Sequence, residues 1–257
     1  MLAKAVIDDT VVIEGRVFRV GVLAGVPVVL GLTGIGLTNA GVTTRALLER
    51  FEVAGVVVSG VAGSSLRIAD VSVPATWVLA DGTSYSADPG WLALAGDIAQ
   101  PRRLALERCT LVPAVSLEEP VCLPHEPAVV IGGVGQSSDT FGDTPFPCQA
   151  AGDDVFGCDV TTASAARAPA VWHALRAAAS ATAAAAPVAE DMETAAIARE
   201  AVARGLPFIA FRAVSDGAGD PLGLPGFPAQ FFAYYHLAAN NAAAATLAFL
   251  DRLADAS

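Results

Sequence analysis

The sequence predicts an α/β fold, a three-layer αβα sandwich with a central mixed sheet. Short buried apolar runs alternate with helical patterns along the chain, which is typical of a sheet covered on both faces. Hydrophobic residues make up 54% of the chain, enough for a large core. No Gly/Ser tract and no run of charge marks a linker, so we expect a single domain spanning residues 1–257.

The first 51 residues predict an antiparallel meander followed by a helix. Three short runs rich in β-branched residues are separated by two pairs of residues that suit tight turns. The runs are 10–13, 16–23 and 26–31, and the turns are Glu14-Gly15 and Ala24-Gly25. The helix is expected to begin at Thr38 or Asn39 and to end near Phe51.

The middle of the chain has a weaker pattern. Residues 80–127 give no clear prediction, and residues 142–160 predict a long loop. The expected strands are Val56–Ser59, Val71–Leu79 and Val129–Ile131, and the expected helices are Ala170–Ala179 and, near the C-terminus, Pro228–Leu253.

Two carboxylates stand one helix and one strand apart near the C-terminal end. After an apolar run, Asp191 can cap a helix and Glu193 lies in its first turn. Asp216 follows Ser215 at the carboxyl end of the buried strand 207–214, where α/β folds bind ligands. Such a pair suits cleavage of a sugar–base bond, because one carboxylate can hold ribose hydroxyls while the other protonates the leaving base. The structural alternative is a turn and a favourable helix-dipole partner.

The charge and the hydropathy of the chain argue against several classes of binding partner. The net charge of −11, with only 15 basic residues, argues against nucleic acid and against anionic membranes. No apolar run reaches the length of a membrane span, and the N-terminus lacks the apolar region of a signal peptide. We therefore expect a small-molecule substrate and a cytoplasmic location.

The cysteines and histidines predict neither a metal site nor a cofactor. None of the four cysteines forms a Cys-x-x-Cys pair, and the three histidines show no ligand spacing. We favour four reduced thiols. The alternative is an exported protein with two local disulfides, Cys109–Cys122 and Cys148–Cys158.

Five motifs occur in a familiar order between about residue 30 and the C-terminus. They are Gly34-Ile35-Gly36-Leu37-Thr38-Asn39-Ala40, Gly60-Val61-Ala62-Gly63, Ser137-Ser138-Asp139-Thr140-Phe141, Asp191-Met192-Glu193-Thr194-Ala195-Ala196 and Ser215-Asp216. Together they resemble the nucleoside phosphorylase and nucleosidase superfamily, and most of all its 5′-methylthioadenosine/S-adenosylhomocysteine nucleosidases. The resemblance implies the phosphorylase/hydrolase-like fold, hydrolysis of the N-ribosidic bond to release adenine, and no cofactor.

The resemblance also implies roles for single residues. Asp216 would protonate the purine N7, and Ser215 would orient Asp216. Glu193 would bind the ribose hydroxyls, with Met192 packed under the sugar. Phe141 would stack on the adenine; core packing is its alternative.

The segment Gly60-Val61-Ala62-Gly63 is expected at a strand end, where small residues let the backbone approach the ligand. In phosphorylases of this superfamily an arginine and a hydroxyl residue near this segment bind phosphate. The matching places are Val58 and Val61, which cannot bind an anion. This departure favours water as the nucleophile.

Phe231, Phe232 and Tyr235 could line an apolar pocket for a 5′-alkylthio group or simply pack on the core.

One family element finds no match. Members begin with a strand and a loop that carries a water-activating glutamate, and Asp8, Asp9 and Glu14 do not match its place. We therefore expect that the first strand and this glutamate are absent from the sequence. A phosphorylase and a non-catalytic nucleoside-binding or storage-type member of the fold stay open as alternatives. Export is open too, if an upstream segment carries a signal, and the resemblance implies a homodimer.

Overall fold

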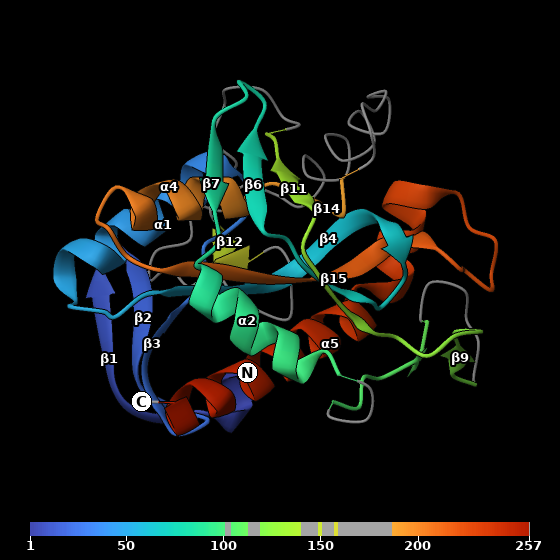
Figure 1. Cartoon of the computed structure of the whole chain (residues 1–257), viewed down its shortest axis with the longest axis horizontal. Coiled ribbons are helices and arrows are strands. Elements are labelled where there is room, and N and C mark those ends of the chain that lie inside the picture. Colours follow the sequence, from blue (N-terminus) through green and yellow to red (C-terminus); the bar gives the residue numbers. More distant parts are fainter. Residues whose placement is uncertain (101–103, 113–118, 140–148, 151–156, 159–186, 257) are drawn as a thin grey trace.

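The central element of the computed structural model is an eight-stranded mixed sheet with helices on both faces (Figure 1). The structure describes every residue except 101–103, 113–118, 140–148, 151–156, 159–186 and 257. The strands lie in the order β10 (Val129–Ile131), β5 (Val71–Val73), β15 (Phe208–Ala218), β4 (Val56–Arg67), β14 (Ala189–Asp191), β11 (Val134–Ser137), β6 (Thr76–Leu79) and β7 (Ser84–Ser86). This confirms the predicted mixed sheet.

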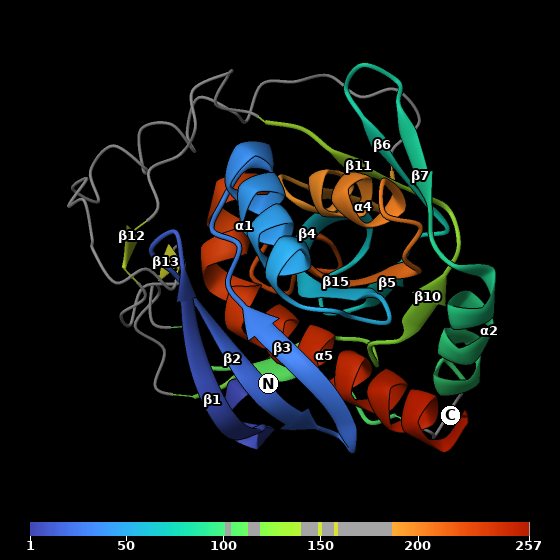
Figure 2. The ribbon, with the colours of Figure 1, turned by 90° about the vertical axis from the view of Figure 1, so that its left-hand side faces the viewer.

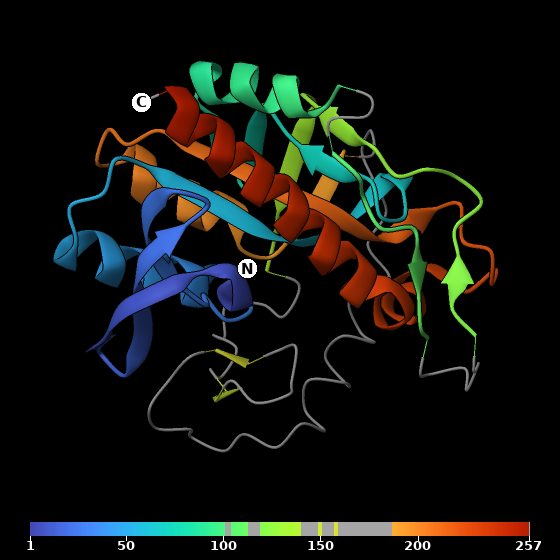
Figure 3. The same ribbon diagram turned by 90° about the horizontal axis from the view of Figure 1, so that it is seen from below.

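The helices form the two outer layers. Helices α1 (Leu37–Arg50) and α4 (Thr194–Val202) cover one face of the sheet, while α2 (Pro89–Ile98) and α5 (Gly226–Ala256) cover the other (Figure 2). Figure 3 shows α5 running diagonally across its face with α2 beside it. The three-layer αβα arrangement is therefore confirmed.

A hydrophobic core fills each interface between layers. Phe211 and Ile209 of β15 pack against Phe249 of α5, and all three are fully buried. On the opposite face, Phe208 of β15 and Trp77 of β6 pack with Ile197 of α4. Successive side chains of β15 point into the cores on opposite faces of the sheet. The strand is therefore buried on both sides, which explains its nearly continuous apolar sequence.

The predicted meander forms a separate three-stranded antiparallel sheet. Its strands are β1 (Val6–Ile13), β2 (Arg16–Leu23) and β3 (Val26–Gly31), preceded by a short 3-10 helix, η1 (Leu2–Lys4). Both turn pairs, Glu14-Gly15 and Ala24-Gly25, have positive φ at each residue, as tight hairpin turns require. The first strand begins four residues earlier than predicted.

The prediction of one strand over Val71–Leu79 is wrong. The chain leaves the sheet at Pro74, which has no N–H for the ladder, and forms two strands that are far apart in the sheet order. Helix α2 lies in the stretch that gave no prediction. Its N-cap is Asp88, whose carboxylate accepts the Trp91 N–H at 2.9 Å, and Pro89 is its first residue. That Asp-Pro pair was the overlooked helix signal.

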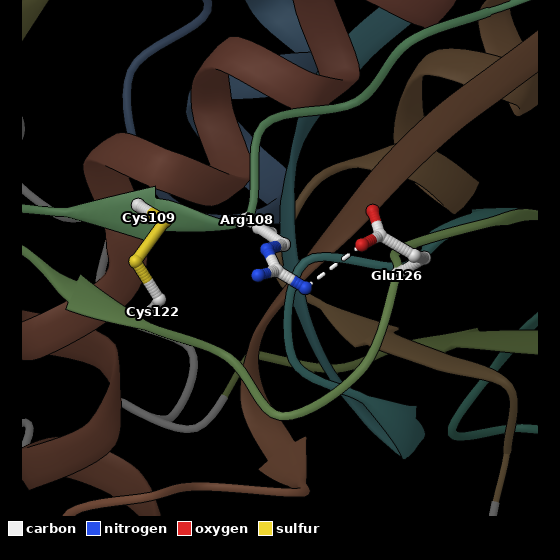
Figure 4. Close-up of a disulfide and its surroundings, with 4 residues drawn as sticks. All are labelled: Arg108, Cys109, Cys122 and Glu126. Atoms are coloured by element: carbon white, nitrogen blue, oxygen red, sulfur yellow. Dashed lines mark hydrogen bonds and ion pairs between the residues drawn. A yellow bond between two sulfur atoms is a disulfide. The ribbon is translucent and has the colours of Figure 1, made fainter.

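Two cysteines are joined, contrary to the four reduced thiols that we favoured. Strands β8 (Cys109–Thr110) and β9 (Val121–Cys122) pair with Cys109 opposite Cys122, and these residues form a disulfide (Figure 4). Arg108, next to it, pairs with Glu126 at 2.8 Å. This is one of the two local disulfides that the sequence left open as an alternative. The two strands themselves are only two residues long, too short for a sequence pattern to reveal them. The side chains of Cys148 and Cys158 lie outside the described part of the chain.

Two predicted segments lie wholly or partly outside the described residues. Two short strands, β12 (Gln149–Ala150) and β13 (Gly157–Cys158), pair in parallel within the predicted loop 142–160. The rest of that loop and the predicted helix Ala170–Ala179 lie outside the described residues. Within the ranges described, no helix is long and apolar enough to cross a membrane.

Candidate functional site

Strand β4 brings the two predicted carboxylate motifs together. Its neighbours in the sheet are β14, which leads into Asp191-Met192-Glu193, and β15, which carries Ser215 and Asp216. Gly63 is the register partner of residues on both sides, Glu190 of β14 and Asp216 of β15. Residues that are far apart in the sequence therefore meet across one central strand.

The carboxylate of Asp191 binds the start of helix α4, although Asp191 is not the N-cap residue that the sequence predicted. Its carboxylate accepts the backbone N–H groups of Glu193 and Thr194, each at 3.2 Å, and the hydroxyls of Ser137 and Thr194. Glu193 itself occupies the N-cap position, not the first turn, and makes no capping bond with its side chain. The Glu193 carboxylate is consequently left for other partners.

Arg212 is a central residue that the sequence analysis did not single out. Its guanidinium is buried and pairs with Asp191 at 2.8 Å and with Glu193 at 3.3 Å. It also donates to the Thr194 hydroxyl at 2.8 Å and to the Val61 carbonyl at 3.3 Å. The signal was present, because an arginine inside an otherwise apolar strand must find buried partners.

Glu193 lies in a partly buried polar cluster with a perturbed pKa. Burial raises its pKa to about 6; the Arg212 charge opposes this shift and the Asp191 charge adds to it. The N–H of Gly36, in the turn before α1, donates to Glu193 Oε1 at 3.1 Å. The turn Gly34–Gly36, where both glycines have positive φ, therefore helps to hold this carboxylate.

Asp216 lines a cleft of about 370 Å³. Burial raises the pKa of its carboxyl group, the hydrogen bond from Ser215 opposes the rise, and the charge of Glu190 adds to it. The Ser215 hydroxyl lies 2.7 Å from Asp216 Oδ1 and 3.3 Å from the Ala62 carbonyl. Asp216 thus keeps its proton to a higher pH than an ordinary aspartate, as a general acid must. The cleft is lined by Gly63, Ser64, Ser65, Pro187, Glu190, Asp216, Gly217, Gly226 and Gln230.

The expectation that Gly60 and Gly63 stand at a strand end is wrong, since both lie inside β4. A Cβ at Gly60 would lie 2.2 Å from an Arg212 nitrogen, and a Cβ at Gly63 would lie 2.8 Å from Asp216 Oδ2. The two glycines therefore make room for the side chains of Arg212 and Asp216 on β15. Val61 and Ala62, between them, contribute their carbonyls to Arg212 and Ser215.

Helix α5 holds the end of strand β15 and the loop that follows it. Gln230 accepts the Gly217 N–H at 2.9 Å, and Asp220 accepts the Leu222 N–H at 2.8 Å and the Tyr234 hydroxyl. Sequence reasoning missed this network, because its partners come from a loop and a helix whose relative positions no local pattern fixes.

The remaining predicted site residues differ in what the structure shows. Met192 is half-buried beside Glu193. Phe231 stacks on Tyr235 and meets Phe232 edge-on at the start of α5, so these rings contact one another. Phe141 lies outside the described residues.

Comparisons with known proteins identify the family of this chain. The family model described as the phosphorylase superfamily matches residues 7–252. An uncharacterized protein of Mycobacterium tuberculosis is 35% identical over 180 residues, which cover 62% of this chain and 70% of that protein.

Two solved structures share the fold at low identity. A 5′-methylthioadenosine/S-adenosylhomocysteine nucleosidase from Colwellia psychrerythraea, in complex with adenine, gives a TM-score of 0.61 at 22% identity and covers 98% of this chain and 88% of its own. A futalosine hydrolase mutant of Helicobacter pylori gives 0.61 at 18% identity, covering 100% and 92%. With the family model matching nearly the whole chain, the protein belongs to the phosphorylase superfamily.

Proposed function

We propose that the protein hydrolyses the N-ribosidic bond of 5′-methylthioadenosine or S-adenosylhomocysteine and releases adenine. One observation carries this proposal: Asp216, a carboxyl group with a raised pKa, lines a cleft one strand away from the segment that carries Glu193. The structures of similar fold that contain adenine or a methylthio inhibitor support the choice of substrate.

In this reaction Asp216 donates its proton to N7 of the purine. The bond between C1′ and N9 then breaks, its electron pair leaves with the base, and adenine departs neutral. The ribosyl group gains oxocarbenium character, and Glu193 binds its hydroxyls. Water then adds to C1′ and loses a proton to the solvent, so C1′ gains a hydroxyl group, and Asp216 takes up a proton again before the next turnover.

Water is the proposed nucleophile because, among the described residues, the positions that bind phosphate in the phosphorylases offer no group that could bind an anion. Val58 is buried and apolar, and Val61 offers only its carbonyl, which Arg212 already uses. The guanidinium of Arg212 is itself paired with two carboxylates. An added phosphate would have to break these ion pairs.

The test is to incubate the purified chain with methylthioadenosine, with and without phosphate, and to measure free adenine. Release without phosphate is the expected result. Release only with phosphate would favour a phosphorylase. Futalosine should be offered in parallel, because a futalosine hydrolase is among the structures of similar fold.

A non-catalytic nucleoside-binding protein is the second candidate. It is favoured by the position of the acidic residues near the start of the chain: Asp8 and Asp9 are exposed on β1, and Glu14 is in the turn after it. None matches the place of the water-activating glutamate that the resemblance implies. A folded sample that binds methylthioadenosine without releasing adenine would favour this candidate.

The homodimer implied by the resemblance is part of the proposal, and light scattering would test it.

A further inference from the structure

Glu190, Gly63 and Asp216 form a row across three neighbouring strands. Gly63 pairs with Glu190 on the β14 side and with Asp216 on the β15 side. Residues directly opposite each other in a sheet project their side chains from the same face. The two carboxyl groups therefore rise on the same face, on either side of a residue that has no side chain.

Both acidic residues line the cleft of about 370 Å³, and Gly63 lies between them. Asp216 leans toward β4, since its Oδ2 is only 2.8 Å from the position of a Cβ at residue 63. Strands lie about 4.8 Å apart, so roughly 10 Å separates the backbones that carry the two acids. Because Asp216 leans over Gly63 toward the side of Glu190, one edge of a planar base placed beside the two acids would meet both carboxyl groups.

The other polar side chains of the cleft have partners within the protein. Ser64 donates its hydroxyl to the Val188 carbonyl at 2.7 Å, and Ser65 donates to the Pro187 carbonyl at 3.2 Å. Gln230 accepts from Gly217 and donates toward Leu224 at 3.3 Å. Glu190 is exposed and makes no hydrogen bond through its side chain to the described residues. Glu190 and Asp216 are thus the lining groups best able to contact a ligand.

We propose that Glu190 is a specificity-determining residue of the base site, which accepts a hydrogen bond from the 6-amino group of the purine whose N7 faces Asp216. This inference rests on the proposed function. N7 and the 6-substituent lie on the same edge of a purine. A carboxylate can only accept, so it matches the N–H donors of adenine, whereas the carbonyl of a 6-oxopurine would face another acceptor. A binding site that accepts a hydrogen bond from the 6-amino group therefore discriminates against a 6-oxopurine, which has no such donor.

The charge of Glu190 is consistent with this arrangement. It contributes to the raised pKa of Asp216, so the two acids are close enough to interact. Asp216, whose pKa is raised, donates to N7, and the carboxylate oxygens of Glu190 accept from the amino group.

The test is calorimetric titration of the wild-type chain and of Glu190→Gln with adenine and with hypoxanthine. The substitution should weaken adenine binding about tenfold, because a charged hydrogen bond is lost. It should strengthen hypoxanthine binding, because an amide can donate to the 6-oxygen. Glu190→Ala should weaken adenine binding without strengthening hypoxanthine binding. Glu52→Gln, an exposed glutamate outside the cleft, is the matched control and should change neither affinity.

The outcomes separate the inference from the proposed function. If the wild type binds adenine and Glu190→Gln binds it equally well, Glu190 does not read the base, while the proposed function stands. If the wild type binds neither base, the base site is absent, and both proposals are overturned.

Discussion

Gly63 and Asp216 are register partners in the parallel pair β4–β15, and the Asp216 carboxyl group occupies the space that a side chain at residue 63 would need. A Cβ at residue 63 would stand 2.8 Å from Asp216 Oδ2, closer than real Cβ contacts allow. Asp216 can therefore lean over β4 into the cleft only because residue 63 is glycine.

Gly63→Ala should displace the Asp216 carboxyl group and leave the fold intact. The added methyl group meets the end of a side chain that can rotate, while the backbone at Gly63 does not have the positive φ that only glycine favours. We expect adenine release to fall about a hundredfold, since a shift of about 1 Å can cost that much. The measurement is kcat/KM for methylthioadenosine. Gly96→Ala, on α2 with no atom within 4 Å of the added Cβ, is the control and should keep full activity.

Asp216→Asn should remove the proposed proton donor. An amide of the same shape cannot protonate N7, so kcat should fall by about 10²–10⁴, the usual contribution of a general acid. Steady-state adenine release would show the loss, while methylthioadenosine should still bind. Asp97→Asn is the control, because Asp97 lies in a solvent-accessible ion pair with Arg252 on the α2–α5 side. Full activity in Asp216→Asn would contradict the assigned role.

Sequence reasoning found the two segments that carry the acids of the proposed chemistry because each follows a recognisable apolar run. Both elements exist but with other bounds: the strand extends to Ala218 and so contains Ser215 and Asp216, which were expected after its end. Helix α4 begins at Thr194, with Glu193 as its N-cap. Arg212 was visible as a lone charge in an apolar strand, but its partners come from the α4 side and could not be named in advance.

Other features depend on contacts that no local pattern specifies. The row Glu190–Gly63–Asp216 exists only because β14 and β15 flank the same strand, and strand order is a property of the whole sheet. The disulfide joins two strands of two residues each. Pro74 lies between β5 and β6, which occupy distant positions in the sheet. In each case a short segment takes its place from tertiary packing instead of its own sequence preference.

Arg212→Met should destabilise the fold strongly. Removing the buried guanidinium leaves Asp191 and Glu193 without their cation, and breaking a buried pair in this way costs about 3–5 kcal/mol. Urea denaturation would measure the free energy of unfolding. Arg108→Met is the matched control: its pair with Glu126 is exposed, so the loss should stay below about 1 kcal/mol. Equal losses in both variants would show that the buried cluster does not support the fold.

Glu193→Gln should change the pH dependence of stability in a defined direction. Burial raises the pKa of Glu193 from 4.5 to about 6, so the folded state binds this proton more tightly than the unfolded state. The stability that the proton contributes is therefore complete below pH 4.5 and is lost as the pH rises through 6. Glutamine does not titrate and avoids this loss.

Urea denaturation of the wild type and of Glu193→Gln at several pH values between 4 and 8 would measure the effect. The free energy of unfolding of the variant, minus that of the wild type, should rise by about 2 kcal/mol between pH 4.5 and 7 and then level off. Loss of the contacts with Arg212 and Gly36 adds an offset that does not depend on this titration, so the slope is the test. A difference that stays constant with pH would mean that Glu193 ionises as readily in the folded chain as in the unfolded one.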